Sequence, residues 1–159
     1  MSERKPITIL LVEDNPDHAL IIQRGLAANH VVNEIRVVKD GQEALDYLFQ
    51  RGPYADPAKA PRPGLILLDI KLPKVDGFEV LQCIKGTPSL KAIPVIMLTS
   101  SEQETDIARS YLQGANSYIT KPIQFTEFVE KIKELKLYWI LVNKLPPEST
   151  FAEHAYEAL

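Results

Sequence analysis

The stretch "LILLDIKLPKVDG", residues 65–77, begins with a buried run that leads directly into a carboxylate. Its first four residues, Leu65 to Leu68, are apolar, as expected of a strand that is buried on both faces of a sheet, and Asp69 follows them. A charged group at the end of a buried run costs free energy unless another group pairs with it. We therefore expect Asp69 to belong to a functional site whose other members come from elsewhere in the chain.

Apolar runs and helical patterns alternate on both sides of this stretch. Short apolar runs predict five strands, at residues 7–12, 33–38, 65–69, 93–100 and 116–120. Helical spacing predicts five helices, at residues 16–28, 40–50, 76–86, 102–114 and 124–144. This order predicts an α/β fold, with a parallel sheet covered by helices on both faces and right-handed crossovers.

The proline-rich stretch "RGPYADPAKAPRPG", residues 51–64, is predicted to be a loop. We expect it to be an insertion and not a linker between domains, because the strand and helix pattern continues after it. The chain of 159 residues fits one domain of ordinary size. We expect this domain to cover residues 1–147 and a C-terminal tail to cover residues 148–159.

Composition argues against several classes of function. A net charge of −3 gives no electrostatic support for binding nucleic acid or an anionic membrane. The chain has one cysteine, Cys83, so an internal disulfide is excluded. Cys83 is expected to be a packing residue of the helix at 76–86. The apolar run from Ile7 to Val12 is too short for a signal peptide or a membrane span. We expect a cytoplasmic protein with neither nucleic acid nor membrane as a partner.

Polar side chains stand at the carboxyl ends of four expected strands. Glu13 and Asp14 follow the first strand, Asp69 ends the third, Thr99 ends the fourth, and Lys121 follows the fifth. Ligands of open α/β sheets bind at this edge. If the first and third strands are neighbours, three carboxylates converge and need a counter-ion, and oxygen ligands suit Mg²⁺. A lone aspartate after a strand is more often a helix cap or a loop residue, but four such strand ends argue against that interpretation.

At these residues the sequence resembles the receiver domains of two-component response regulators. The matching stretches are "LLVEDN", "LILLDIKLPKVDG", "IPVIMLTS" and "YITKP", in the order and spacing of that family. The resemblance spans about residues 6–142. It implies a five-stranded, doubly wound (βα)5 fold, flavodoxin-like or CheY-like, with strand order 2-1-3-4-5.

The resemblance also implies a role for each matching residue. Asp69 would accept a phosphoryl group from a phosphohistidine on a sensor histidine kinase. Glu13, Asp14, Asp69 and the main-chain carbonyl of Lys71 would hold Mg²⁺, with Asp14 the more direct ligand of the acidic pair. Lys121 would pair with the phosphoryl oxygens. The protein would be a signalling phosphoacceptor that dephosphorylates itself slowly, and not a classical enzyme.

The residues expected to transmit the signal are Thr99 and Tyr118, which match the switch pair of the family. A new phosphoryl dianion would recruit the Thr99 hydroxyl and let Tyr118 turn inward, which would change the surface formed by the fourth helix, fifth strand and fifth helix. Taken from the residues alone, Tyr118 could equally be a strand aromatic that packs against its neighbour.

The proline-rich loop and the C-terminal part of the chain indicate a particular group within this family. Three stretches are similar to single-domain regulators paired with phytochrome histidine kinases. They are the proline-rich loop, "DIARSYLQGANSYITKPIQFTEFVE" and "YWILVNKLPPE". That similarity implies a homodimer through the surface named above. Tyr138, Trp139, Ile140 and Leu141 cannot all face one core, which suggests an interface. The alternative is that the C-terminal segment folds back and covers them.

Two residues near the predicted site have less certain roles. Lys71, two residues after Asp69, could shield the phosphoryl group and lengthen its life, or it could be a solvated lysine with no effect. His18, in the first turn of the helix at 16–28, is expected to be a surface residue or a contact for the kinase.

Three other functions are compatible with parts of this pattern. A flavodoxin-type electron carrier needs a phosphate-binding loop after the first strand, where "EDNPD" would repel phosphate. An aspartyl-nucleophile phosphatase has a second aspartate where Lys71 stands. The remaining alternative is a pseudo-receiver, an interaction module that keeps the shape of the family without being phosphorylated.

Overall fold

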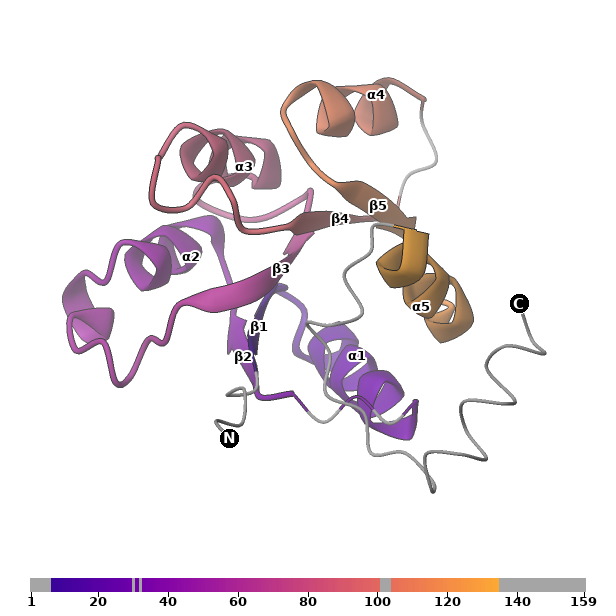
Figure 1. Ribbon diagram of the computed structural model, residues 1–159, viewed down its shortest axis with the longest axis horizontal. Helices are drawn as coiled ribbons and strands as arrows, with labels where there is room; N and C mark the ends of the chain where they lie inside the picture. Colours follow the sequence, from indigo (N-terminus) through magenta and orange to yellow (C-terminus); the bar gives the residue numbers. More distant parts are fainter. Residues whose placement is uncertain (1–6, 30, 32, 101–103, 135–159) are drawn as a thin grey trace, which may run out of the picture.

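The core of the computed structural model, which describes residues 7–29, 31, 33–100 and 104–134, is a five-stranded sheet (Figure 1). The strands are β1 (Thr8–Val12), β2 (Ile35–Val38), β3 (Pro63–Asp69), β4 (Val95–Thr99) and β5 (Ser117–Thr120). They lie in the order β2-β1-β3-β4-β5, and every neighbouring pair is parallel. The predicted fold class and strand order are confirmed.

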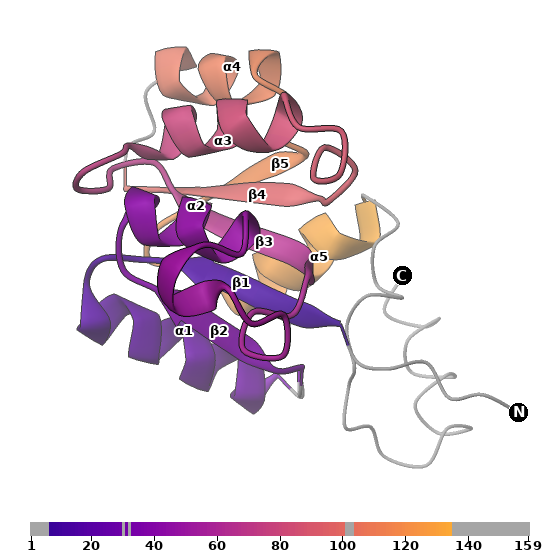
Figure 2. The same cartoon turned by 90° about the vertical axis from the view of Figure 1, so that its left-hand side faces the viewer.

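Five α-helices connect and cover these strands. They are α1 (Pro16–Ala28), α2 (Gly41–Leu48), α3 (Gly77–Lys85), α4 (Glu104–Leu112) and α5 (Phe125–Glu134). Figure 1 shows α2, α3 and α4 on one face of the sheet and α1 and α5 on the other. In Figure 2, α4, α3 and α2 follow one another across the sheet. The sheet is therefore covered on both faces, as the alternation of strands and helices predicts.

The strands have continuous apolar runs because each face of the sheet has its own core. Successive strand residues point to opposite faces, so Leu10 and Val12 lie in the core beside α2 and α3, whereas Ile9 and Leu11 lie in the core beside α1 and α5. Each of these four side chains is fully buried. Burial of one such side chain stabilises the fold by about 1.5–3 kcal/mol.

Side chains and glycines at the helix ends fix where the helices begin and end. The Asn15 side chain accepts hydrogen bonds from the main-chain N–H groups of Asp17 and His18, at 2.9 and 3.2 Å, and so caps α1. Asp40 caps α2 in the same way, and α3 ends at Gly86. Such caps satisfy main-chain groups that would otherwise lack partners at the helix ends.

The proline-rich loop at 51–64 packs back onto α2. The Tyr47 hydroxyl donates to the carbonyl of Pro61 at 2.7 Å, and the Gln50 side chain donates to the carbonyl of Ala60 at 3.2 Å. A short 3-10 helix, Gly52–Tyr54, lies within the loop, and the Tyr47 and Tyr54 rings are in contact, with centroids 5.2 Å apart. These contacts are those of an insertion that belongs to the domain.

Cys83 is a correction to the sequence analysis. Its side chain is exposed on α3 and does not pack in the core. The helical period explains the error, because Val80, Leu81 and Ile84 turn toward the sheet and leave position 83 on the outer face.

The described residues end within the last predicted helix, at Glu134. The predicted interface residues Tyr138, Trp139, Ile140 and Leu141 and the tail at 148–159 therefore lie outside the described residues. Within the described part of the chain, no helix combines the length and apolar character needed to cross a membrane.

Candidate functional site

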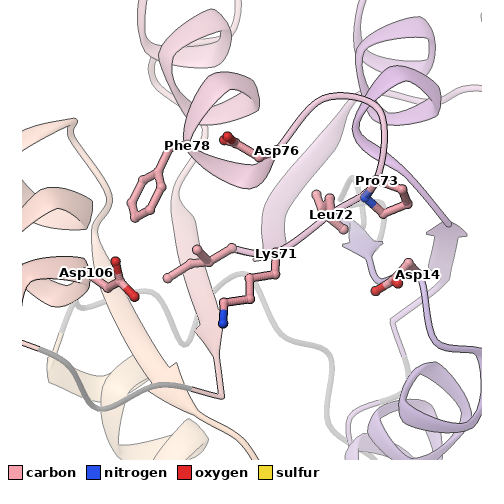
Figure 3. Close-up of a pocket in the computed structure, with 8 residues that line it drawn as sticks. Asp14, Lys71, Leu72, Pro73, Asp76, Phe78 and Asp106 are labelled. Carbon is pink, nitrogen blue, oxygen red and sulfur yellow. The ribbon is translucent and has the colours of Figure 1, made fainter.

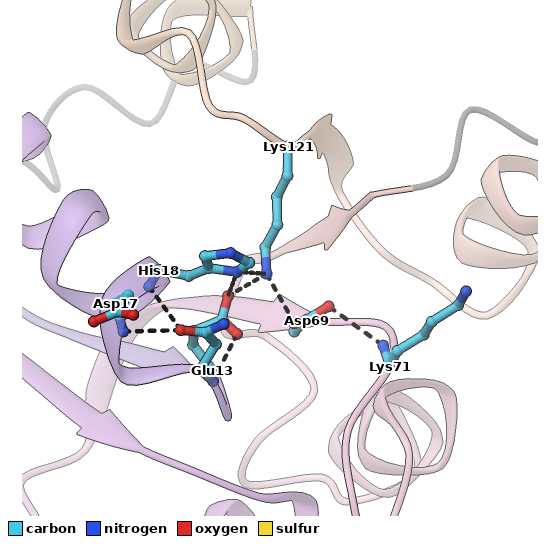
Figure 4. A network of polar contacts seen from close by, with 7 residues as sticks. Glu13, Asp17, His18, Asp69, Lys71 and Lys121 are labelled. Carbon is cyan, nitrogen blue, oxygen red and sulfur yellow. Dashed lines mark hydrogen bonds and ion pairs between the residues drawn. The ribbon is translucent and has the colours of Figure 1, made fainter.

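The carboxyl ends of β1, β3 and β5 bring four predicted site residues together, of which Figure 4 shows Glu13, Asp69 and Lys121. One carboxylate oxygen from each of Glu13, Asp14 and Asp69 lies within 4.8 Å of the other two. The Lys121 ammonium donates to Asp69 Oδ2 at 2.9 Å and is also paired with Glu13. The sequence analysis predicted this convergence from the strand ends alone.

The register of the sheet explains why these side chains meet. Val12 of β1 pairs with Leu68 of β3, so Glu13 and Asp69 leave their strands at the same level. Gly77 then lets the start of α3 come close, since a Cβ there would lie 2.2 Å from the main-chain oxygen of Asp69. A larger residue at position 77 would push α3 away from the end of β3.

The two acidic residues after β1 have different surroundings. The Glu13 side chain is fully buried, pairs with Lys121 through Oε1 and accepts a hydrogen bond from the Asn15 N–H through Oε2 at 3.2 Å. Asp14 is exposed, and no hydrogen bond within the described residues engages its carboxylate. Asp14 is therefore the member of the pair whose oxygens are available to a ligand.

The buried position of Lys121 is compensated by its two carboxylate partners. Its side chain is 12% exposed, and burial alone lowers the pKa of its ammonium. The hydrogen bonds from Lys121 to Glu13 and Asp69 outweigh that effect, so its pKa is raised above the ordinary value. Lys121 therefore stays charged at neutral pH.

The acidic residues fit a hard divalent cation such as Mg²⁺. Glu13, Asp14 and Asp69 offer oxygen ligands, which this ion prefers, and the exposed position of Asp14 leaves room for water ligands. The three negative charges exceed the single positive charge of Lys121, so a cation would relieve the repulsion among them. The three carboxylates of the predicted metal site are thus close enough together to share one cation.

Lys71 approaches Asp69 through its main chain. The Lys71 N–H donates to Asp69 Oδ1 at 3.3 Å, whereas the Lys71 side chain is exposed. Figure 3 shows this side chain in a hollow of about 550 Å³, which Asp14 also lines, with Asp106 of α4 on the opposite side. The Lys71 side chain extends away from Asp69 (Figure 4) and shares this hollow with Asp14 and Asp106.

The predicted switch residues lie on β4, which is next to the strand of Asp69, and on β5, which is the next strand along. Thr99 is the last residue of β4, is 3% exposed, and pairs with Thr120 across to β5. The Tyr118 ring is half-buried on β5, in edge contact with the Tyr111 ring at 5.9 Å between centroids. The peptide bond between Lys121 and Pro122 is cis.

The sequence analysis missed the contact that His18 makes in this site. His18 Nδ1 lies 3.5 Å from Lys121 Nζ and 3.9 Å from Glu13 Oε1, as Figure 4 shows. The His18 side chain is also half-exposed, so the expectation of a surface residue holds in part. The position of His18 near the acidic site was predicted from its place in the first turn, whereas its contact with Lys121 was not.

Comparisons with known proteins agree with this geometry. The family model for the response regulator receiver domain matches residues 9–133. The probable methanogenesis regulatory protein FilR2 of Methanothrix harundinacea is 41% identical over 89% of this chain and 88% of its own. Response regulator Rcp1 of Synechocystis is 39% identical over 89% of this chain and 94% of its own.

Solved structures of response regulators are similar to this chain as well. The Mn²⁺-bound form of Rcp1 superposes with a TM-score of 0.70, covering 89% of this chain and 99% of that one. The phosphorylated cyanobacterial phytochrome response regulator RcpA is 45% identical, with a TM-score of 0.72, covering 86% of this chain and 95% of that one. The chain therefore belongs to the response regulator receiver family and is related to phytochrome response regulators.

Proposed function

We propose that this chain is a stand-alone response regulator that accepts a phosphoryl group on Asp69. The donor is a phosphohistidine of a sensor histidine kinase, and Mg²⁺ is held by Glu13, Asp14, Asp69 and the carbonyl of Lys71. The observation that carries this proposal is the convergence of two other carboxylates, Glu13 and Asp14, and the Lys121 ammonium on Asp69. The site lies in the cytoplasm, where such kinases present their phosphohistidine.

In this mechanism an oxygen of the Asp69 carboxylate forms the new bond to phosphorus while the P–N bond of the phosphohistidine breaks. Phosphoryl transfer requires mainly alignment and stabilisation of charge, so a weak nucleophile suffices. Lys121, already 2.9 Å from Asp69 Oδ2, donates to the oxygens of the arriving phosphoryl group. When bound, Mg²⁺ neutralises the charge on those same oxygens.

The signal then leaves through Thr99 and Tyr118. The Thr99 hydroxyl donates to a phosphoryl oxygen, and its movement opens space for the Tyr118 ring to turn inward. Because Tyr118 packs against α4, its movement changes the surface formed by α4, β5 and α5. A partner protein, or a second copy of the chain in a homodimer, binds this changed surface.

The names of relatives support parts of this proposal. A Mn²⁺-bound Rcp1 and a phosphorylated RcpA show that relatives at 39% and 45% identity bind a divalent metal or carry a phosphoryl group. RcpA favours a bacterial phytochrome as the kinase, whereas FilR2 is named for methanogenesis. We therefore propose the class of kinase, with a phytochrome as the first candidate to test.

Intact-mass measurement after incubation with Mg²⁺ and acetyl phosphate tests the proposal. We expect the parent to gain one phosphoryl group and Asp69→Asn to gain none. Asp17→Asn, which changes an exposed acid in the first turn of α1, is the matched control and should react like the parent. No mass gain in the parent, with acetyl phosphate or with a phosphorylated kinase, would support the pseudo-receiver alternative.

A further inference from the structure

Three acceptors surround the ammonium of Lys121. A lysine ammonium has three N–H donors and no acceptor. Glu13 and Asp69 take two of these donors, and His18 Nδ1, at 3.5 Å, is in position to take the third. Since Lys121 only donates, a hydrogen bond between these two groups requires Nδ1 to be the acceptor, with the proton of a neutral imidazole on Nε2.

One residue sets the positions of two of these partners. The Asn15 side chain accepts from the His18 N–H at 3.2 Å, and the Asn15 N–H donates to Glu13 Oε2 at 3.2 Å. The cap of α1 therefore holds both His18 and Glu13 relative to the end of β1. The ring of His18 reaches Lys121 because the helix begins directly beside the acidic site (Figure 4).

His18 stands on the open side of Lys121. A hollow of about 340 Å³ beside the ammonium is lined by His18, Ile21, Ser100 and Pro122, among other residues. The two carboxylate partners are at most 10% exposed, whereas the His18 side chain is 50% exposed. Of the groups that contact the ammonium, His18 is thus the one that separates it from solvent.

We propose that His18 is a positioning residue for Lys121 in phosphoryl transfer, through a hydrogen bond from the ammonium to Nδ1. This inference rests on the proposed phosphorylation of Asp69. During the reaction, negative charge moves from the Asp69 carboxylate to the phosphoryl oxygens, so Lys121 must leave Oδ2 and follow it. Glu13 and Asp69 hold the ammonium from the buried part of the site, and His18 holds it from the half-exposed side.

Two substitutions of His18 separate positioning from packing. His18→Leu introduces an apolar side chain of similar size that has no acceptor. His18→Asn retains an acceptor, because its Oδ1 lies at the same distance along the side chain as Nδ1 of histidine. At pH 8, where an ordinary imidazole is neutral, we expect His18→Leu to slow phosphorylation by acetyl phosphate about threefold to tenfold. His18→Asn should stay within about twofold of the parent, as should the control Gln23→Leu further along α1.

A measurement without metal or phosphoryl donor tests the contact itself. In ¹⁵N NMR spectra, the Nδ1 resonance of His18 should move when Lys121→Met removes the donor. His30 and His154, the other two histidines of the chain, serve as internal controls and should not move.

Three results would overturn the inference: equal rates for His18→Leu and the parent, no rescue by His18→Asn, or an unchanged Nδ1 resonance. A parent that takes up no phosphoryl group would instead refute the proposed function. The NMR comparison would still decide whether His18 accepts from Lys121.

Discussion

Glu13 and Asp69 share one ammonium, and this sharing sets the charge balance of the site. Both carboxylates are buried, and burial of a charge is costly unless a partner compensates it. Lys121 compensates one negative charge, so the second, together with that of Asp14, remains for a cation to balance. At the scale of single residues, the site is therefore built to attract a cation before it attracts a phosphoryl group.

Lys71 should lengthen the life of the phosphoryl group. Its side chain lies exposed in the hollow of Figure 3, two residues from Asp69, where a long cation can cover the phosphoryl oxygens and hinder an attacking water. We expect Lys71→Ala to hydrolyse its acyl phosphate about twofold to tenfold faster, which corresponds to a barrier lower by about 0.4–1.4 kcal/mol. The measurement is the decay of the phosphorylated mass after the donor is removed.

The control for this prediction is Lys91→Ala, which removes an exposed lysine outside the site. It should leave the half-life unchanged. Equal half-lives for Lys71→Ala and the parent would make Lys71 a solvated lysine, the alternative interpretation of this position.

At the scale of elements, the Tyr118 ring connects α4, β5 and α5. Tyr111 of α4 packs edge-on against it at an interplanar angle of 84°, and the Lys131 ammonium of α5 lies 5.2 Å from its centroid. Both distances are in the range of attractive aromatic and cation–π contacts. These contacts favour the half-buried position of Tyr118 over the inward position of the proposed switch.

Removal of the Lys131 ammonium should therefore favour the phosphorylated state. A cation–π contact at a partly exposed site contributes about 0.5–1 kcal/mol. We expect Lys131→Met to raise the affinity for beryllofluoride, which stands in for the phosphoryl group, about twofold to fivefold, because coupling between the two sites is reciprocal. Titration followed by NMR or calorimetry measures this affinity.

Lys133→Met is the matched control for Lys131→Met, because it removes an exposed lysine from the same helix. Its beryllofluoride affinity should equal that of the parent. If Lys131→Met also binds like the parent, the contact between Lys131 and Tyr118 does not influence the switch.

The attachment of the loop at 51–64 to α2 should weaken in alkali. The Tyr54 hydroxyl donates to Glu43 at 3.0 Å. Burial is the larger cause and this hydrogen bond the second cause of a pKa of Tyr54 that is raised from 10.0 to about 12. The unfolded chain therefore loses the Tyr54 proton first as pH rises. The stability that neutral Tyr54 provides is complete below pH 10 and is lost as pH rises toward about 12.

Tyr54→Phe tests this linkage. At neutral pH it should lower the free energy of unfolding by about 0.5–1.5 kcal/mol through loss of the hydrogen bond. Between pH 10 and about 12, its free energy of unfolding should fall less steeply than that of the parent. Urea unfolding followed by circular dichroism across this range is the measurement, and parallel curves for the two proteins would contradict the linkage.

The sequence predicted the elements better than it predicted contacts between side chains. Continuous apolar runs predict buried strands whatever their neighbours are, and polar residues at the strand ends then meet because parallel strands end at the same edge. The 3.5 Å approach of His18 to Lys121 joins residues 103 positions apart and depends on rotamers and on the Asn15 cap. The packing of Tyr111 and Lys131 on Tyr118 depends likewise on where α4 and α5 lie over the sheet.

At the scale of the whole molecule, α4 presents apolar side chains that no described element covers. Tyr111 is 46% exposed and Leu112 is 87% exposed, beside the switch residue Tyr118. The sequence places a further apolar group, residues 138–141, beyond the described part of α5. Apolar surface of this kind suggests contact with another chain.

We expect the isolated protein to sediment as a homodimer at micromolar concentration, with this surface at the interface. Leu112→Glu places a charge among apolar side chains and should raise the dissociation constant about tenfold or more, which corresponds to a cost of about 1.4 kcal/mol. Phe49→Glu, a substitution at a 38%-exposed aromatic residue after α2, is the control and should leave the constant unchanged.

The one tryptophan of the chain, Trp139, provides a second measurement of the same equilibrium. If the 138–141 segment lies in the dimer interface, dilution should expose Trp139 and shift its fluorescence to longer wavelength, and Leu112→Glu should produce the same shift at any concentration. If the C-terminal segment instead covers these residues within one chain, the emission will not depend on concentration. A protein that sediments as a monomer at micromolar concentration, with constant emission, would show that the α4 surface serves a different partner.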